Sequence, residues 1–141
     1  MEWYERDKER FLLEVKLIKR HYPNAKTGIS NNTVVVYKKF LGKFNNYFVK
    51  IVYPHNFPYT PPDVNILSPH IEISPHQFPN REKNENGKPC LYDSAEVGHQ
   101  TTGKVICDWS VRWLKAYEVW LASGRRNFPE KKVEEQWIKL R

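Results

Sequence analysis

The sequence predicts an α+β domain, and three observations lead to this prediction. Apolar residues recur at helical spacing near the N-terminus, β-branched and alternating runs follow, and a strongly apolar helical segment comes after Trp109. A helix, then an antiparallel meander, then further helices is the element order of α+β domains. The 141 residues are enough for a single domain, expected to span 1–141, that buries a core without disulfides or metals.

The first helix is expected from about Trp3 to His21. Phe11, Val15 and Ile18 lie at i, i+4 and i+7, with Leu12 and Leu13 beside them, which is the spacing of an amphipathic helix. Tyr22-Pro23-Asn24 ends it. The opposite face carries basic residues, namely Arg6, Lys8, Arg10, Lys16, Lys19 and Arg20.

Three strands are expected next. The segment Thr33–Tyr37 is rich in β-branched residues, and the segment Tyr47–Tyr53 alternates between an apolar face and a mixed face. Lys38–Asn46, which contains Gly42, joins them as the connection of an antiparallel hairpin. The short apolar run Val64–Leu67 adds the third strand.

Between the second and third of these strands lies a turn that its composition makes rigid. Pro54, Pro58, Pro61 and Pro62 fix φ and remove backbone donors, so this segment forms neither a helix nor a sheet ladder. After the third strand comes an irregular loop that ends Phe78-Pro79-Asn80, and then Gly87-Lys88-Pro89-Cys90-Leu91.

The C-terminal part is predicted to be helical. After Trp109 the apolar positions Trp113, Tyr117 and Trp120 indicate a helix that packs across the sheet, with Asp108 as its N-terminal cap. Ser123-Gly124 ends this helix. A short last helix is expected to open at Pro129-Glu130 and to reach Trp137 and Leu140.

Composition limits the classes of function. The net charge of +7 suggests an acidic partner, but the basic residues are spread over both termini and the strands, so binding of nucleic acid is not expected. No apolar run approaches the roughly 20 residues of a membrane span, and the N-terminus lacks the apolar core of a signal peptide. We therefore expect a cytoplasmic protein. The pattern of two cysteines is too thin for a metal site, and none is predicted.

The two cysteines differ in their local sequence. Cys90 follows Gly87-Lys88-Pro89, which forbids a helix and favours an exposed turn, whereas Cys107 lies in the apolar run Val105-Ile106-Cys107. A thiolate is a good nucleophile for acyl transfer, and an acyl carrier needs an exposed cysteine. Cys90 is therefore the candidate nucleophile and Cys107 a structural thiol. The competing interpretation of Cys90 is a small buried hydrophobe.

The order of these motifs resembles that of the ubiquitin-conjugating enzymes, from the first helix to about Ser123. Phe57-Pro58 stands where that family commonly has Tyr-Pro, and Asp108-Trp109-Ser110 is similar to its Trp-Ser-Pro-Ala. The resemblance implies the ubiquitin-conjugating (UBC-like) fold, with an N-terminal helix, a four-stranded antiparallel meander, an active-site loop and C-terminal helices. It also implies a transferase that carries the C-terminus of a ubiquitin-like or other protein as a thioester on Cys90 and passes it to a lysine amine.

The resemblance assigns two further residues. Asn80 occupies the place of the family's His-Pro-Asn asparagine, which stabilises the developing oxyanion or holds the loop, while Phe78 replaces the histidine and His76 is a structural substitute for it. Asp93 stands three positions after Cys90, where the family has an acid two positions after, and is the candidate base for the attacking amine. The alternative for Asp93 is a helix-capping or surface role.

The segment 94–108 between Cys90 and Trp109 is longer than the family leads one to expect. It is either a lid over Cys90 or a surface loop, and we favour the lid.

Partners follow from the same resemblance. The basic face of the first helix either docks an activating-enzyme-like protein or is simply solvated, and a modifier protein and a lysine-bearing acceptor complete the reaction. Ser110-Val111-Arg112 lacks the proline that many ligases of the RING type grip, and the tail is short. Both features resemble divergent bacterial members, some of which are encoded in antiviral operons beside cyclic-nucleotide synthases.

Two other classes of function compete with the enzyme. One is a non-catalytic protein-binding module of the same fold, although the family's inactive variants lack the cysteine that this chain keeps. The other is a basic RNA- or DNA-binding domain, which no sequence motif supports. The sequence also lacks the glycine-rich phosphate-binding motifs, so no nucleotide cofactor is expected.

Overall fold

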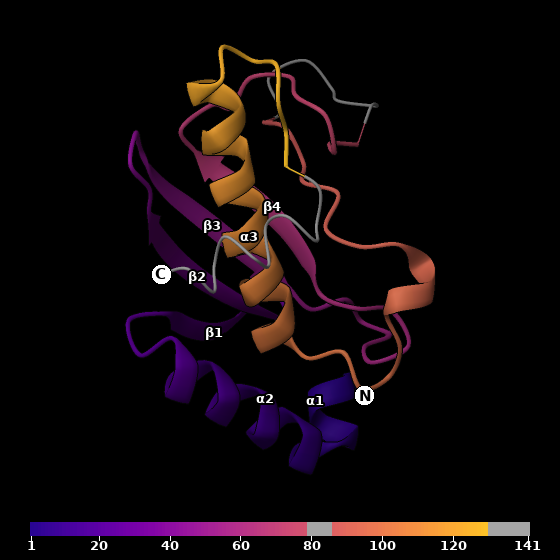
Figure 1. The fold of residues 1–141 in the computed structure, drawn as a ribbon. Coiled ribbons are helices and arrows are strands. Elements are labelled where there is room, and N and C mark those ends of the chain that lie inside the picture. The colour runs from indigo at the N-terminus through magenta and orange to yellow at the C-terminus, as the bar shows by residue number, and fades with distance from the viewer. Residues whose placement is uncertain (79–85, 130–141) are drawn as a thin grey trace.

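The computed structural model describes residues 1–78 and 86–129. Its centre is a four-stranded antiparallel sheet in the order β1-β2-β3-β4 (Lys26–Ser30, Thr33–Leu41, Asn46–Val52 and Asp63–Ser68). The long helix α3 (Gly103–Ala122) lies across one face (Figure 1). The short helix α1 (Trp3–Arg6) and the helix α2 (Lys8–His21) lie at the end of the sheet where α3 begins, and α2 contacts α3. This layout confirms the predicted α+β fold class with its four-stranded meander.

The expected first helix is divided in two. It consists of α1 (Trp3–Arg6) and α2 (Lys8–His21), because Asp7 leaves helical geometry and its side chain accepts a hydrogen bond from Arg10 N at 3.0 Å. Asp7 is thus the N-cap of α2. Because of this break, α1 directs the side chain of Trp3 into the core, where its ring stacks on that of Tyr53.

The predicted apolar stripe of α2 is only partly correct. Ile18 is fully buried and Phe11 packs against the core, but Leu12 and Leu13 are 65% and 46% exposed. Glu14 is buried instead, at 1% exposure. A buried carboxylate needs partners, and Glu14 has three, namely Arg10, Tyr53 and Gly103.

The three strands predicted from the residues are present. They are β2 (Thr33–Leu41), β3 (Asn46–Val52) and β4 (Asp63–Ser68), and β2 extends four residues beyond its predicted end at Tyr37. In β3 the side chains of Tyr47, Val49 and Ile51 are all at most 1% exposed, as the alternation predicts.

An additional edge strand, β1 (Lys26–Ser30), pairs with β2. Its sequence is polar and carries no apolar alternation, so hydrophobic periodicity did not indicate it. The turn before β2 did carry a sequence signal, the pair Asn31-Asn32. In the structure both asparagines adopt positive φ, 50° and 60°. Two such residues are typical of the type I′ turns that join two antiparallel strands.

The C-terminal helix α3 (Gly103–Ala122) begins earlier than expected. Its N-cap is Thr102, whose hydroxyl accepts a hydrogen bond from Val105 N at 3.2 Å. Asp108 is therefore not a cap but lies inside the helix, where it pairs with Lys104. Ser123 follows the last helical residue, as predicted.

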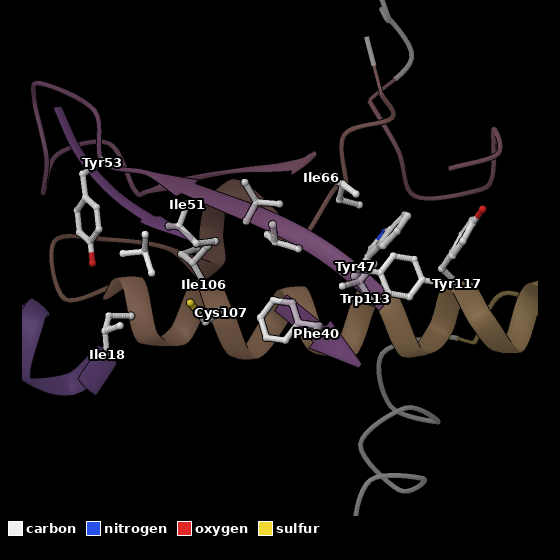
Figure 2. Packing of buried hydrophobic residues seen from close by; sticks show 14 of the residues in the cluster. Ile18, Phe40, Tyr47, Ile51, Tyr53, Ile66, Ile106, Cys107, Trp113 and Tyr117 are labelled. Carbon is white, nitrogen blue, oxygen red and sulfur yellow. The ribbon is translucent and has the colours of Figure 1, made fainter. Parts of the chain in front are cut away.

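The hydrophobic core lies between α3 and the inner face of the sheet (Figure 2). One end holds Ile18, Ile51, Tyr53, Ile106 and Cys107, and the other end holds Tyr47, Trp113 and Tyr117. Full burial of one large apolar side chain stabilises the folded state by roughly 1.5–3 kcal/mol relative to leaving it exposed.

Part of the sequence prediction lies outside the described residues. This applies to Asn80 and to nearly all of the expected last helix from Pro129 to Leu140. In the parts of the chain that are described, no helix combines the length and the apolar character that crossing a membrane requires.

Candidate active site

Cys90 is held by a short antiparallel contact between two loops. Gln77 and Pro89 form an isolated β-bridge, Phe78 N donates to Lys88 O at 3.0 Å, and Cys90 N donates to His76 O at 2.8 Å. Its side chain is half-buried rather than exposed as the turn sequence suggests. The backbone beside the thiol is therefore fixed on both sides of Pro89.

The carbonyl of His76 connects this loop to α3. Besides the amide of Cys90, it accepts a hydrogen bond from Trp113 Nε1 at 2.9 Å. The imidazole ring of His76 packs against Phe128, with ring centroids 5.0 Å apart. His76 thus has a structural role, as proposed from the sequence, but the atom that holds Cys90 is its backbone oxygen.

Asn86 organises the segment before Cys90 and was not identified from the sequence. Its Oδ1 accepts from the backbone N of Ile71 at 2.7 Å and of Gly87 at 2.9 Å. Its Nδ2 donates to the carbonyls of Ile66 at 3.1 Å and Pro69 at 2.8 Å. These bonds anchor the Cys90 loop to the end of β4. The only sequence signal was the Asn-Gly pair, which favours a turn.

An open pocket of about 230 Å³ lies beside Cys90. One wall is the chain from Cys90 to Asp93, and the opposite wall is the face of α3 that carries Trp109, Arg112 and Trp113. The rings of Tyr92 and Trp109 contact each other, with centroids 5.7 Å apart. The pocket therefore adjoins the residue that carries the thiol.

A second pocket of similar volume, about 230 Å³, opens near the same loop. Leu91 and Tyr92 line both pockets, and the second is otherwise mainly apolar, with Val64 and Phe78 in its lining. Asp63 and Lys88, also in its lining, form an ion pair. The loop that carries Cys90 is therefore bordered by two hollows, one on α3 and one beside β4.

The phenol of Tyr92 remains a hydrogen-bond donor in this site. Burial raises its pKa above the usual value, and the charges of Asp63 and Cys90 raise it further. Tyr92 occupies the position two after Cys90 at which the resembled family has an acid.

Asp93 lines the same pocket as Cys90, and it also starts the 3₁₀ helix η1 (Ser94–Glu96). Asp93 N donates to Glu96 Oε1 at 2.9 Å, and Glu96 N donates to Asp93 O at 2.9 Å. Its own side chain is exposed. The structure thus places Asp93 both at a turn-capping position and at the pocket of Cys90.

The segment 94–108 borders the pocket of Cys90 through Glu96, and its part from Gly103 onward belongs to α3. Thr101 O accepts from Arg10 of α2 at 3.3 Å, and the ring of His99 contacts that of Tyr59. This segment packs toward α2 and the proline turn, so the expected lid is not supported.

Cys107 contrasts with Cys90, as its sequence predicts. Its side chain is fully buried at 0% exposure. Burial, followed by the neighbouring charge of Asp108, raises the pKa of this thiol to about 12. A thiol that is both inaccessible and protonated is not a nucleophile at neutral pH.

Next to Cys107, the buried carboxylate of Glu14 joins three elements. Arg10 Nε lies 3.0 Å from Glu14 Oε2, and both Tyr53 Oη and Gly103 N donate to Glu14 Oε1 at 2.7 Å. Gly103 is required here, because a Cβ at that position would lie 1.9 Å from Tyr53 Oη. The start of α3 is thereby fixed to α2 and to the end of β3.

Metal ligands are not gathered at either cysteine. Within residues 1–78 and 86–129, no three side chains of His, Cys, Asp or Glu are placed to hold a metal ion.

Residues 14–133 match the family model described as "Type II CBASS E2 protein". No curated protein and no solved structure matches the chain. The matched range covers most of the chain and includes both cysteines, Asn80 and Asp93.

Proposed function

The chain belongs to the Type II CBASS E2 protein family, conjugating-enzyme-like proteins of bacterial antiviral operons, and from this premise we propose that it is an acyltransferase that uses Cys90. Cys90 accepts the C-terminus of a ubiquitin-like or other protein as a thioester and passes it to a lysine amine. The donor is an activating-enzyme-like or other protein of the same pathway. We place the reaction in the bacterial cytoplasm, where thiols are kept reduced.

In the first step the Cys90 thiolate attacks the carbonyl carbon of an acyl group that the donor holds as a thioester. The new C–S bond to Cys90 forms, the bond to the donor sulfur breaks, and the donor thiolate takes up the proton that Cys90 has lost. The pocket between the Cys90–Asp93 chain and α3 has room for the extended C-terminal residues that this step must bring to the sulfur.

In the second step a lysine amine attacks the thioester on Cys90. The new C–N bond forms, the Cys90 thiolate leaves, and the amine proton passes to a base, for which Asp93 at the same pocket is the candidate. The negative charge that builds on the carbonyl oxygen is stabilised by an amide donor, the part proposed for Asn80.

The observation that carries this proposal is the difference in access to the two thiols. Cys90 lines an open pocket and its backbone is held by His76 O, whereas Cys107 is fully buried. Fixing the backbone beside a nucleophile, while leaving its sulfur open to two macromolecules, is what an acyl carrier requires.

The test compares two alanine variants in cells that also express the other proteins of the operon. Cys90→Ala is expected to abolish thiol-labile adducts and lysine conjugates, while leaving the circular dichroism spectrum and thermal melt unchanged, because the thiol is half-buried and contributes little packing. Cys107→Ala, the matched control, is expected to keep both products. Conjugation by Cys90→Ala at the level of the unchanged protein would reject the proposal.

A further inference from the structure

The face of the sheet opposite α3 carries exposed aromatic rings together with lysines. Tyr37 and Phe48 project from it at 41% and 45% exposure, because their neighbours Val36 and Tyr47 point into the core. Lysines stand beside both rings. We call these five residues the outer sheet face: Lys26, Tyr37, Lys39, Phe48 and Lys50.

The strand register brings these residues together. Tyr37 of β2 pairs with Lys26 of β1 on one side and with Lys50 of β3 on the other. Two residues further along β2, Lys39 pairs with Phe48 of β3. The two rings therefore stand diagonally on the two central strands, a relation that places the two residues roughly 7–8 Å apart.

Each ring has a lysine ammonium over it. Lys39 Nζ lies 5.6 Å from the ring centroid of Phe48, and Lys50 Nζ lies 5.8 Å from that of Tyr37. The charge on this face is nearly all positive. Of the strand residues that share it in the described sheet, Asp63 at one corner is the only acid, and it pairs with Lys88.

We propose that the outer sheet face binds single-stranded nucleic acid. Exposed rings on the two central strands of a four-stranded antiparallel sheet provide planar surfaces on which unstacked bases can stack, and the lysines beside them attract phosphates. The net charge of +7 adds long-range attraction. In the sequence these lysines are dispersed over three strands, so no basic run with interleaved aromatics indicated the face.

A protein partner fits this face less well. Lysine is depleted at the centres of protein interfaces, where arginine and aromatic residues are enriched. The outer sheet face has lysines at its centre and no arginine. Lysine beside an exposed ring serves phosphate attraction and base stacking together.

This surface is separate from the proposed reaction. None of its five residues lines either of the two pockets near Cys90. Substitutions on the outer sheet face are therefore expected to change nucleic-acid binding without changing thioester formation, so the two proposals can fail independently.

The test measures fluorescence anisotropy of fluorescein-labelled 12-nucleotide oligo-dT and oligo-U with the full chain at several salt concentrations. Binding is expected to weaken with salt. Tyr37→Ala and Phe48→Ala are each expected to weaken it by roughly tenfold, since one stacked base is worth about 1–3 kcal/mol. Lys39→Gln and Lys50→Gln are each expected to reduce the slope of log affinity against log salt by about one.

Matched controls come from other surfaces of the same chain. Tyr59→Ala removes an aromatic ring that is 70% exposed but lies in the proline turn. Lys8→Gln and Lys19→Gln remove exposed charges of α2. The ring control should leave affinity unchanged, and the lysine controls should leave the salt slope unchanged.

Three results would overturn the proposal. The first is absence of binding to both oligonucleotides at about 100 μM protein and low salt. The second is equal loss in the control and face variants, which would mean attraction by net charge alone. The third is binding of another operon protein that Tyr37→Ala abolishes while oligonucleotide affinity stays the same, which would make this face a protein interface.

Discussion

The two thiols of this protein lie in regions built in different ways. Cys107 lies in the core near the buried side chain of Glu14, which bonds to Arg10 of α2, to Tyr53 just after β3 and to the first backbone N–H of α3. Cys90 lies where backbone atoms make the contacts, through His76 O and the bridge at Pro89, and where side chains leave two open pockets. The first arrangement fixes a core, and the second fixes a backbone while leaving a sulfur accessible.

This difference shows what a local sequence can say about a cysteine. The apolar run before Cys107 predicts burial, and a Gly-Lys-Pro segment before Cys90 predicts a turn. Neither segment indicates which contacts fix the turn. These contacts come from residues distant in sequence, such as Trp113, whose Nε1 donates to the same carbonyl of His76 that accepts from Cys90 N.

The largest difference is expected in alkylation. At pH 8 and without denaturant, iodoacetamide should modify Cys90 at least about a thousandfold faster than Cys107, because Cys107 becomes accessible only when the core opens. Mass spectrometry of tryptic peptides over time measures both rates. Similar rates for the two thiols would contradict the comparison.

The pKa of Cys107 adds a stability effect with a defined sign. Burial raises it from 9.0 to about 12, so the folded state holds the thiol proton more tightly than the unfolded state. The resulting stabilisation is fully present at neutral pH and is lost as the pH rises from about 9 toward 12. Replacing the thiol by Cys107→Ala should remove this part of the alkaline loss, which urea titrations at pH 8 and 10.5 would detect.

A further prediction concerns the carboxylate in the Cys107 region. Glu14→Ala should lower the free energy of unfolding by about 3–5 kcal/mol, because Arg10, Tyr53 and Gly103 lose a buried partner. Glu9→Ala on the exposed side of the same helix is the control and should cost less than about 1 kcal/mol. Equal costs in urea denaturation would show that the buried carboxylate does not anchor this region.

How far the sequence predicts the fold depends on where apolar residues make the contacts. The strands β2, β3 and β4 and most of α3 follow from alternation or helical spacing, and these elements enclose the core. The other elements do not. The polar edge strand β1 is held by its backbone pairing with β2, while the break at Asp7 and the early start of α3 after Thr102 depend on side-chain caps. The spacing of apolar residues along the sequence does not reveal such interactions.

The residues assigned to the candidate site stay predictions, whereas the bonds that support the Cys90 loop are seen only in the structure. Cys90, Asn80 and Asp93 were assigned from local motifs and from their order along the chain. The bonds of Asn86 to β4 and the oxygen of His76 depend on loops that meet only in the folded state. The buried Glu14 was hidden for the same reason, since its partners Tyr53 and Gly103 are distant in sequence.

The next prediction separates the two asparagines of the Cys90 region. Asn80→Ala should slow transfer to the amine by roughly 10²–10³ and slow loading of Cys90 less, as expected for an oxyanion donor. Asn86→Ala should slow both steps alike and lower the melting temperature, because it releases the loop from β4. Single-turnover loading and discharge, followed on non-reducing gels, give both rates. If Asn80→Ala slowed loading more than it slowed discharge, relative to the unchanged protein, this would argue against the assigned role.

The smallest effect is expected at Asp93. Asparagine is as good an N-cap as aspartate, so Asp93→Asn keeps the capping role and removes only the base. Discharge to lysine should slow by about 10² at most, since water can also accept a proton at an exposed site, and the melting temperature should not change. A lower melting temperature with unchanged discharge would assign Asp93 to structure alone.

The central claim is that Cys90 carries an acyl group, and intact mass tests it most directly. The unchanged protein and Cys90→Ser are purified from their native host under acidic, non-reducing conditions and weighed before and after thiol treatment. The account predicts a thiol-labile protein adduct on the unchanged chain and a thiol-stable ester on Cys90→Ser, whose mass identifies the modifier. If neither form carries an adduct when the other operon proteins are co-expressed, the claim is contradicted and the chain is a binding module of this fold.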